Sequence, residues 1–201
     1  MEFETEAVLE SAMRLFWTHG YQATSTAMLM EAMGLSKSSL YKTFHSKSAL
    51  FELCIDRYTK MRLGELEILR DAAPDTVSFV RRLLERVVEN AAAGRRTGGV
   101  EGAKASSCLL VNTTCELSGV HPEFGAAVDG GLDRIAGILE EALQHGVENG
   151  ELRSDTEVPT LALYLFNSWC GLAVMATRGV SPARLQSIVD MAMNTLEAQT
   201  P

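Results

Sequence analysis

Apolar residues recur at helical spacing along almost the whole chain. In residues 4–19 the apolar set includes Val8, Ala12 and Leu15, and residues 75–93 repeat the pattern with Val80 and Leu84. Steps of three and four residues place apolar side chains on one face of an α-helix, whereas a half-buried strand needs strict alternation. We find no strand-like alternation of useful length. The sequence therefore predicts an all-α fold.

Capping residues divide this pattern into about nine helices. Gly20 and Gly34 stand where helix C-caps are expected, and Ser36 and Ser46 precede new apolar runs as N-caps do. The glycine-rich stretch 94–107 is expected to be a loop. We expect helices over residues 4–19, 26–33, 37–44, from 47 to beyond 63, 75–93, 108–117, 122–146, 159–178 and 182–196.

Length and composition indicate a globular intracellular protein. With 201 residues, 46% of them hydrophobic, the chain suits one compact domain or a small domain fused to a larger one. Four cysteines are too few for a disulfide scaffold. The acidic start lacks the basic and apolar regions of a secretion signal. We expect a cytoplasmic protein with reduced thiols.

The uncharged stretch 160–177 allows two interpretations. It approaches the length of a membrane-spanning helix. It also contains polar residues such as Asn167 and Ser168, and a helix that is apolar all round is more often buried in a protein core or a subunit interface. We therefore favour a buried helix and expect no membrane partner.

Charge is distributed unevenly along the chain. The net charge is −8, from 18 basic and 26 acidic residues. Residues 1–60 hold six basic and seven acidic residues, which leaves 12 basic and 19 acidic residues for the rest. Residues 32–51 carry three lysines and a histidine with no acid. The overall acidity argues against a nucleic-acid partner, but this window is suited to one.

Two short expected helices, 26–33 and 37–44, are separated by Gly34 and Leu35. This arrangement matches a helix-turn-helix, which places its second helix in the major groove of DNA. At 100° per residue, Leu40 and Phe44 share the side facing the core. The opposite side carries Ser38, Tyr41, Lys42 and His45. Lysines on such a face suit phosphates or guanine edges, while the alternative is an ordinary solvated face.

The amino-acid sequence of residues 8–58 resembles the DNA-binding domain of the TetR (tetracycline repressor-like) family. The matching positions are Gly20-Tyr21, Thr24-Ser25, Gly34-Leu35-Ser36-Lys37, Leu40-Tyr41, Phe44 and Ser46-Lys47. The resemblance implies a homodimeric, ligand-responsive transcriptional regulator, usually a repressor. It implies a DNA-binding domain over residues 1–48 and a larger helical effector-binding and dimerisation domain over 49–201.

The same resemblance implies a set of DNA contacts in and around the helix-turn-helix. Met28, Leu29 and Met30 are apolar where relatives often have a polar residue, so base contacts from the first of the two helices are not expected beyond Thr26. The implied contacts are Thr26, Lys37, Ser38, Ser39, Tyr41, Lys42, His45 and Lys47.

In that family the last two long helices pair with their twofold mates in a four-helix bundle. The uncharged residues 164–176 and the face of residues 188–193 would then lie at or near the dimer interface. A twofold dimer is expected to bind a pseudo-palindromic operator whose half-sites lie a whole number of helical turns apart.

Residues 107–117 resemble a helix start in a TetR subgroup that includes NemR, a repressor that senses electrophiles. The cysteine matching Cys108 is the reactive one there, and a helix N-terminus favours the thiolate. The partner lysine of that repressor corresponds to Thr177 here. The alternative is that Cys108 is a small buried hydrophobe, as free cysteines usually are.

The more general expectation is a small, largely apolar effector bound among the middle helices. Plain core packing is the alternative for each candidate residue. The candidate effector or sensor residues are Cys108, Asn112, Cys115, Tyr164, Asn167, Trp169 and Met175.

Catalytic and metal-binding patterns are missing from the sequence. It contains no GxSxG, HExxH or dinucleotide-binding fingerprint, and its cysteines and histidines lack zinc-ligand spacing. We therefore expect no enzyme activity, no metal and no cofactor. A helical interaction module that does not bind DNA is the remaining alternative.

Overall fold

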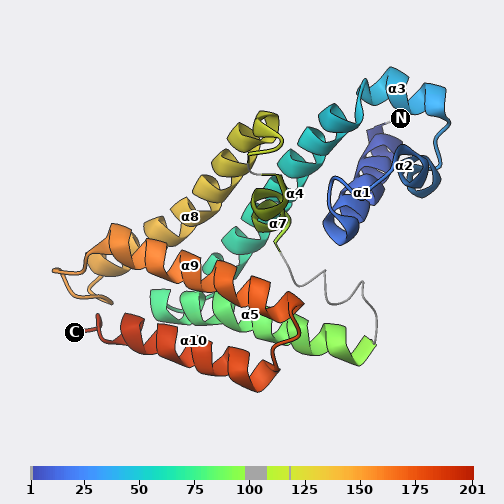
Figure 1. The fold of residues 1–201 in the computed structure, drawn as a ribbon. Coiled ribbons are helices and arrows are strands. Elements are labelled where there is room, and N and C mark those ends of the chain that lie inside the picture. Colours follow the sequence, from blue (N-terminus) through green and yellow to red (C-terminus); the bar gives the residue numbers. More distant parts are fainter. Residues whose placement is uncertain (1, 98–107, 118) are drawn as a thin grey trace. The chain divides into compact units, whose positions relative to one another are not determined.

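The computed structural model describes residues 2–97, 108–117 and 119–201, and within these ranges every regular element is helical (Figure 1). This confirms the all-α fold class. The elements are α1 (Glu2–His19), α2 (Thr26–Met33), α3 (Lys37–Phe44), α4 (Lys47–Asp71), α5 (Thr76–Thr97), α7 (Leu109–Leu117), the 3-10 turn η1 (Pro122–Phe124), α8 (Gly125–Glu148), α9 (Val158–Thr177) and α10 (Pro182–Glu197).

The helix ends lie within a few residues of their expected positions, with two corrections. No loop starts at residue 94, because α5 continues to Thr97. The rest of the expected loop, residues 98–107, lies outside the described ranges. Pro122 opens a short 3-10 turn before α8 rather than the α-helix itself.

Side-chain and glycine caps explain why the short helices begin and end where they do. Ser25 and Ser36 accept hydrogen bonds from the backbone N–H groups of Met28 and Ser39 and so cap α2 and α3. Gly34 ends α2 in the left-handed conformation at φ 63°, which glycine adopts without strain.

The chain forms two compact units. Unit 1 contains Met1–Met61 and Leu109–Leu132, and unit 2 contains Arg62–Cys108 and Asp133–Pro201. Unit 1 therefore includes the segment expected to bind DNA, together with the first half of α4, all of α7 and the start of α8. Both boundaries between the units fall inside continuous helices, α4 and α8.

An aromatic cluster forms the centre of unit 1. The Phe51 ring lies 4.8 Å from Phe16, 4.9 Å from Tyr21 and 5.0 Å from Phe124, between ring centroids. Phe16, Phe51 and Phe124 are buried. Aromatic pairs at these separations stabilise the fold beyond the area that they bury. The cluster joins α1 and α4 to a residue more than 70 positions further along the chain.

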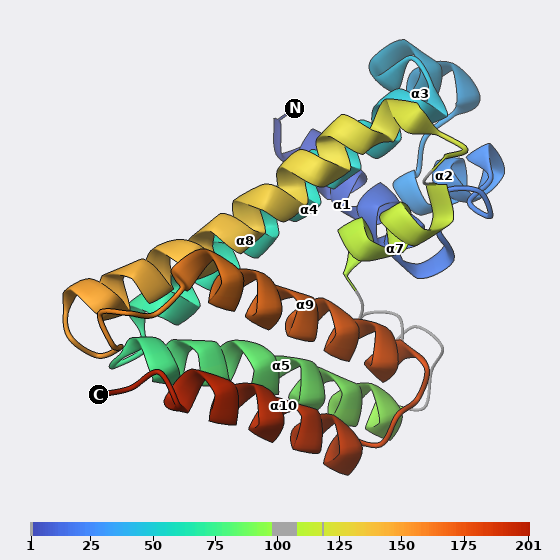
Figure 2. The ribbon, with the colours of Figure 1, turned by 60° about the vertical axis from the view of Figure 1, so that its left-hand side comes forward.

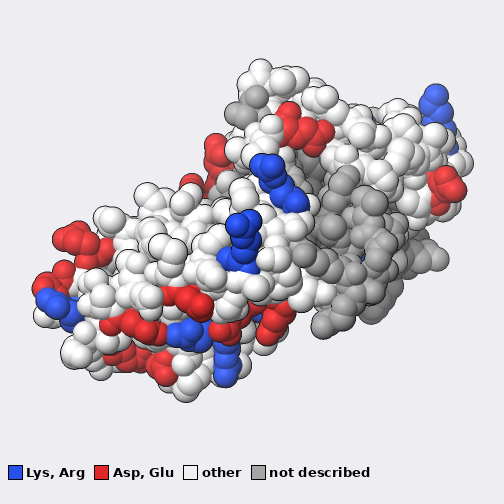
Figure 3. Space-filling view, turned by 60° about the horizontal axis from the view of Figure 1, so that its bottom comes forward, with Lys and Arg blue, Asp and Glu red and all other residues white. Residues whose placement is uncertain are grey.

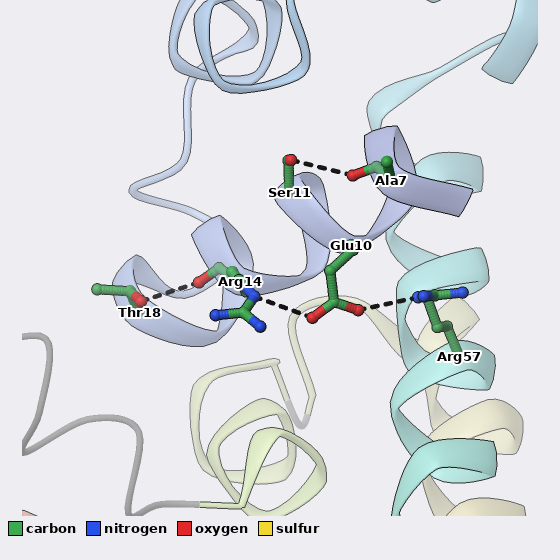
Figure 4. A network of polar contacts seen from close by, with 6 residues as sticks. All are labelled: Ala7, Glu10, Ser11, Arg14, Thr18 and Arg57. Atoms are coloured by element: carbon green, nitrogen blue, oxygen red, sulfur yellow. Dashed lines mark hydrogen bonds and ion pairs between the residues drawn. The ribbon is translucent and has the colours of Figure 1, made fainter. Parts of the chain in front are cut away.

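An ion-pair network on α1 adds a polar contact to this packing (Figure 4). The Glu10 carboxylate accepts hydrogen bonds from Arg14 at 2.9 Å and from Arg57 of α4 at 3.1 Å. The Arg57 and Glu10 side chains are 30% and 27% exposed, so solvent screens this pair only in part. The network links α1 to α4.

In unit 2, helices α5, α9 and α10 pack side by side, as Figures 1 and 2 show from two directions. Among the described helices, α9 alone is long and apolar enough to cross a membrane by length and composition. The core helix of a soluble protein meets the same criteria, and eight α9 residues, Trp169 among them, are buried within this structure. The packing favours the expected buried helix.

Candidate nucleic-acid interface

Helix α3 separates a buried side from an exposed side, as its spacing predicts. Leu40 and Phe44 are 0% and 4% exposed and belong to the unit 1 core. The residues expected to contact DNA in and after α3 are all exposed, namely Lys37, Ser38, Ser39, Tyr41, Lys42 and His45. Thr26, the first residue of α2, is half-buried. The exposed side of α3 is therefore free of acidic groups and rich in hydrogen-bond donors.

The serines at the start of α3 bond to one another. The Ser36 hydroxyl lies 3.0 Å from the Ser38 hydroxyl and 2.9 Å from the Ser39 hydroxyl while it accepts the Ser39 N–H at 3.2 Å. A hydroxyl has one donor and two acceptor sites, so Ser38 and Ser39 keep capacity for a further bond to a phosphate or base. Their positions are fixed by the cap before any ligand arrives.

His45 has a positive φ, a backbone conformation that the sequence does not predict at this position. Among the described residues, it alone other than the glycines has a positive φ, 64°, and its N–H donates to the Tyr41 carbonyl at 3.0 Å. A non-glycine residue in this region costs about 1–3 kcal/mol, and such strain is often found at functional sites. The conformation ends α3 abruptly and places His45 between α3 and α4.

Lys47 lies against the aromatic cluster rather than extending freely into solvent. Its Nζ is 4.3 Å from the centre of the Tyr21 ring, a cation–π contact. Burial lowers the pKa of Lys47, and the nearby Glu116 carboxylate opposes this shift. Burial also raises the pKa of the Tyr21 hydroxyl, with a further rise from Glu123. Tyr21 therefore lies beside a candidate DNA contact, although helical spacing did not identify it as a site residue.

A second contact that the sequence did not reveal joins α7 to the turn before α2. Glu116 accepts the backbone N–H groups of Tyr21 and Gln22 at 3.0 Å and 2.8 Å. These partners are 95 and 94 residues away along the chain. Gly20, expected as a helix cap and as part of the family resemblance, is the one local sign of a close approach at this turn.

Unit 2 brings together two of the seven candidate effector or sensor residues. Cys108 and Trp169, 4% and 3% exposed, line one small cavity of about 30 Å³. Its lining consists of Arg62, Glu65, Leu66, Leu69, Leu83, Arg86, Val87, Asn90, Cys108, Trp169 and Ala173. A larger hollow of about 580 Å³ elsewhere in unit 2 is lined by charged groups of both signs, including Arg70, Glu141 and Glu151.

The other five candidates lie elsewhere in the structure. Tyr164 and Asn167 are on the exposed face of α9, and Met175, also on α9, is half-buried. On α7, Asn112 is half-buried and Cys115 is exposed. None of these five is among the residues that line the cavity containing Cys108.

Two of the four thiols have raised pKa values. Burial raises the pKa of Cys170 to about 12, with a smaller effect from Cys108, and raises the pKa of Cys54 further. The thiolate is the reactive form of cysteine, so these two thiols are poor nucleophiles near neutral pH. In the part of the chain that the structure describes, no three His, Cys, Asp or Glu side chains are grouped as metal ligands would be.

Two eight-residue helices joined by a left-handed glycine, with an exposed cationic side on the second, define a helix-turn-helix protein. Residues 8–54 match the family model described as bacterial regulatory proteins of the tetR family. Residues 84–192 match the tetracyclin repressor-like C-terminal domain. The chain belongs to the TetR family of bacterial transcriptional regulators, and the expectation that it is not an enzyme is confirmed.

Curated relatives match over nearly the full length. The chain is 28% identical over 201 residues to the uncharacterized HTH-type transcriptional regulator YezE of Bacillus subtilis, covering 98% of this chain and 97% of YezE. It is 29% identical over 189 residues to the HTH-type transcriptional repressor ComR of Escherichia coli, covering 92% of this chain and 85% of ComR.

Solved structures share the fold. The TetR family regulator CifR, a cysteine mutant complexed with 26-base-pair operator DNA, is 29% identical with a TM-score of 0.76, and the match covers 95% of each chain. Reduced NemR of E. coli has a TM-score of 0.83 over 95% of each chain at 21% identity. At that identity the likeness shows the fold alone, and a NemR-like role for Cys108 stays a prediction.

Replacing Lys47 tests whether it binds a phosphate. In Lys47→Ala we expect weaker operator binding by a similar factor on every sequence, and a slope of log K against log salt that is smaller by about 0.9, because one phosphate contact is lost. The measurement is fluorescence anisotropy at several salt concentrations, with the exposed Lys60 replaced by Ala as a control. A changed base preference with an unaltered slope would refute the phosphate role.

Proposed function

We propose that this chain is a cytoplasmic, dimeric repressor that binds a pseudo-palindromic operator through α3 and leaves it when a small molecule binds in unit 2. The observation that carries the proposal is the exposed, acid-free side of α3 opposite the buried Leu40 and Phe44. Membership of a family of regulators supports it, as does the operator-bound structure of CifR. The relative ComR is described as a repressor, which supports repression rather than activation.

Charge distribution favours contact through unit 1 at the helix-turn-helix. Residues 32–51 hold lysines and no acid, whereas 19 of the 26 acidic residues follow residue 60. Figure 3 shows acidic and basic side chains mixed over the face of unit 2 that it presents. A mixed, net acidic body repels the DNA backbone weakly and non-specifically, so attraction is concentrated at α3 and its flanks.

A dimer through α9 and α10 is supported by large apolar side chains that the single chain leaves exposed. Leu163 and Tyr164 of α9 are 67% and 40% exposed, and Ile188 and Met191 of α10 are 39% and 69% exposed. Large apolar groups gathered on adjacent helices are typical of a protein interface. A second copy of the chain would cover them by the same two helices, as twofold symmetry requires.

The effector would bind in the unit 2 cavity lined by Trp169. Its walls combine leucines with a polar side at which Arg62 and Arg86 approach the same Glu65 oxygen, at 2.7 Å and 3.8 Å. The Arg62 guanidinium also lies 5.6 Å from the centre of the Trp169 ring. Apolar walls with few polar groups are usual for small-molecule sites. At about 30 Å³ the cavity would have to widen, and that widening is the conformational change that ligand binding would favour.

Binding at the two sites would be coupled. A ligand that favours a conformation in which the helix-turn-helix units do not fit the operator must lower operator affinity, and operator DNA must lower ligand affinity by the same factor. Helix α4 runs through the boundary between the two units and is the expected link.

Charge reversal on α3 is the direct test of DNA binding. In Lys42→Glu we expect loss of the mobility shift on DNA from upstream of the chain's own coding sequence, because an anion then faces the phosphates. Lys60→Glu makes the same charge change at an exposed position of α4 and should bind like the parent. Unchanged binding by Lys42→Glu would exclude α3 as the DNA-reading helix.

The dimer is tested on the exposed face of α9. Leu163→Glu places a charge in the proposed interface, where an unpaired buried charge costs about 3–5 kcal/mol, and should give monomers in analytical ultracentrifugation. Operator binding should fall with dimerisation. Ile68→Glu, at a residue of α4 that is 72% exposed, is the matched control and should remain dimeric. A dimeric Leu163→Glu protein would place the interface elsewhere.

A second candidate function is electrophile sensing, and the position of Cys108 in the cavity wall favours it. A reactive molecule that enters the cavity would meet this thiol, whereas the exposed Cys115 is open to any reagent.

Operator release by N-ethylmaleimide tests which of these two thiols is the sensor. If Cys108 is the sensor, Cys108→Ser should keep its operator after the reagent is added, and Cys115→Ser should release it as the parent does. Mobility shift with mass spectrometry of the modified residues measures both. Equal release by the parent and by Cys108→Ser would exclude Cys108 as the sensor.

A further inference from the structure

The Glu116 carboxylate holds the turn between α1 and α2 at two points. Its Oε2 accepts the Tyr21 N–H at 3.0 Å and its Oε1 accepts the Gln22 N–H at 2.8 Å. Hydrogen bonds to a carboxylate are shorter and stronger than those between neutral groups. Because both oxygens are engaged, the turn is fixed in orientation as well as in distance.

Gly20 leaves the space that this contact needs. A Cβ at position 20 would lie 2.6 Å from Oε2 of Glu116, closer than real Cβ contacts allow. The φ of Gly20 is +83°, a conformation that other residues adopt only with strain. The glycine expected as a simple helix cap therefore also allows the close approach of a side chain from α7.

The same carboxylate acts on Lys47, the residue predicted to contact a phosphate. Its charge opposes the lowering of the Lys47 pKa by burial, and Lys47 lies over the ring of Tyr21, whose N–H Glu116 accepts. One side chain thus holds the backbone of the turn and favours the charged form of a neighbouring cation.

The held turn leads directly into the helix-turn-helix. Gln22 is followed after two residues by Ser25, the cap of α2, and α2 is followed after three residues by α3. The Thr24 hydroxyl donates to the Gly20 carbonyl at 2.6 Å, so the intervening backbone is also held. A shift of the turn would be passed to α2 and then to α3, because only short connections separate these elements.

We propose that Glu116 is a positioning residue through which α7 sets the helix-turn-helix in the position that binds the operator. The proposal rests on the function proposed above. Helix α7 begins immediately after Cys108, so it is also the element through which a change at that residue would act on the turn. Glu116 itself need not touch DNA.

The direction of the change in operator affinity when Glu116 is replaced distinguishes a positioning role from a purely electrostatic one. Glu116→Gln keeps the size of the side chain, but its NH₂ group faces a backbone N–H where an oxygen accepted one. Loss of a negative charge should by itself strengthen DNA binding. Loss of the charge on Lys47 would instead weaken binding, and a smaller salt slope would reveal it. If Glu116 positions the turn, its loss should weaken DNA binding. We expect operator affinity to fall about ten-fold, which corresponds to about one tenth of the protein remaining in the conformation that binds the operator.

The matched control is Glu52→Gln, which removes the same charge from an exposed position of α4 in unit 1. It should bind as tightly as the parent or slightly more tightly. The salt slope of Glu116→Gln should equal that of the parent, because no phosphate contact is removed. Affinity equal to or above that of the parent would overturn the proposal.

Amide hydrogen exchange provides a second measurement that needs no DNA. In the parent, the Tyr21 and Gln22 amide protons should exchange slowly, and in Glu116→Gln they should exchange at least about ten-fold faster while the α4 amides keep their rates. Exchange at the same rate in both proteins would overturn the proposal. If the parent bound no operator, the proposed function would fail, and the exchange rates would still decide the role of Glu116.

Discussion

Burial of Leu40 and Phe44 is the interaction on which the proposed DNA-binding side of this molecule depends. Helix α3 has eight residues, and isolated helices shorter than about 12–15 residues are marginal in water. Its exposed side therefore keeps its arrangement only because the opposite side is packed in unit 1. The buried core of the same unit also includes Phe124, at the end of η1, which packs against Phe51 of α4. The support of α3 would therefore extend to a segment distant in sequence. A change in that segment is then able to alter DNA binding without touching a DNA contact.

The electrostatics of unit 1 follow from the same arrangement. Its second segment, 109–132, brings three acidic residues, Glu116, Glu123 and Asp129, and no lysine or arginine. Glu116 accepts two backbone N–H groups, and Glu123 bonds to His121, which lowers the pKa of the Glu123 carboxyl. Two of these acids are thus tied to donors within the unit, while residues 32–51 stay free of acid. The net acidity of the chain is therefore compatible with a local DNA site.

Local features of the fold could be predicted, and non-local ones could not. The cap at Ser36 and the buried side of α3 follow from residues within one or two turns, which the sequence shows directly. The contact of Glu116 with Tyr21 joins residues 95 apart, and nothing around Glu116 distinguishes it from an ordinary helix carboxylate. In α9 the residues are uncharged all round, so periodicity could not separate the buried Trp169 from the exposed Tyr164. Both were expected to line an effector site, but only Trp169 lines the cavity with Cys108.

The composition of α9 bears on the proposed dimer and on its fit to the operator. Its inner face packs against α5 and α10, which accounts for only part of an uncharged run that covers all sides of the helix. The remaining apolar residues, of which Leu163 is the most exposed on α9, are available to a second partner. In the proposed dimer that partner is the same helix of another copy. The contact of α9 and α10 would then set the distance between two α3 helices, and with it the spacing of the half-sites. Base preference would be a property of α3, and half-site spacing a property of helices that never touch DNA.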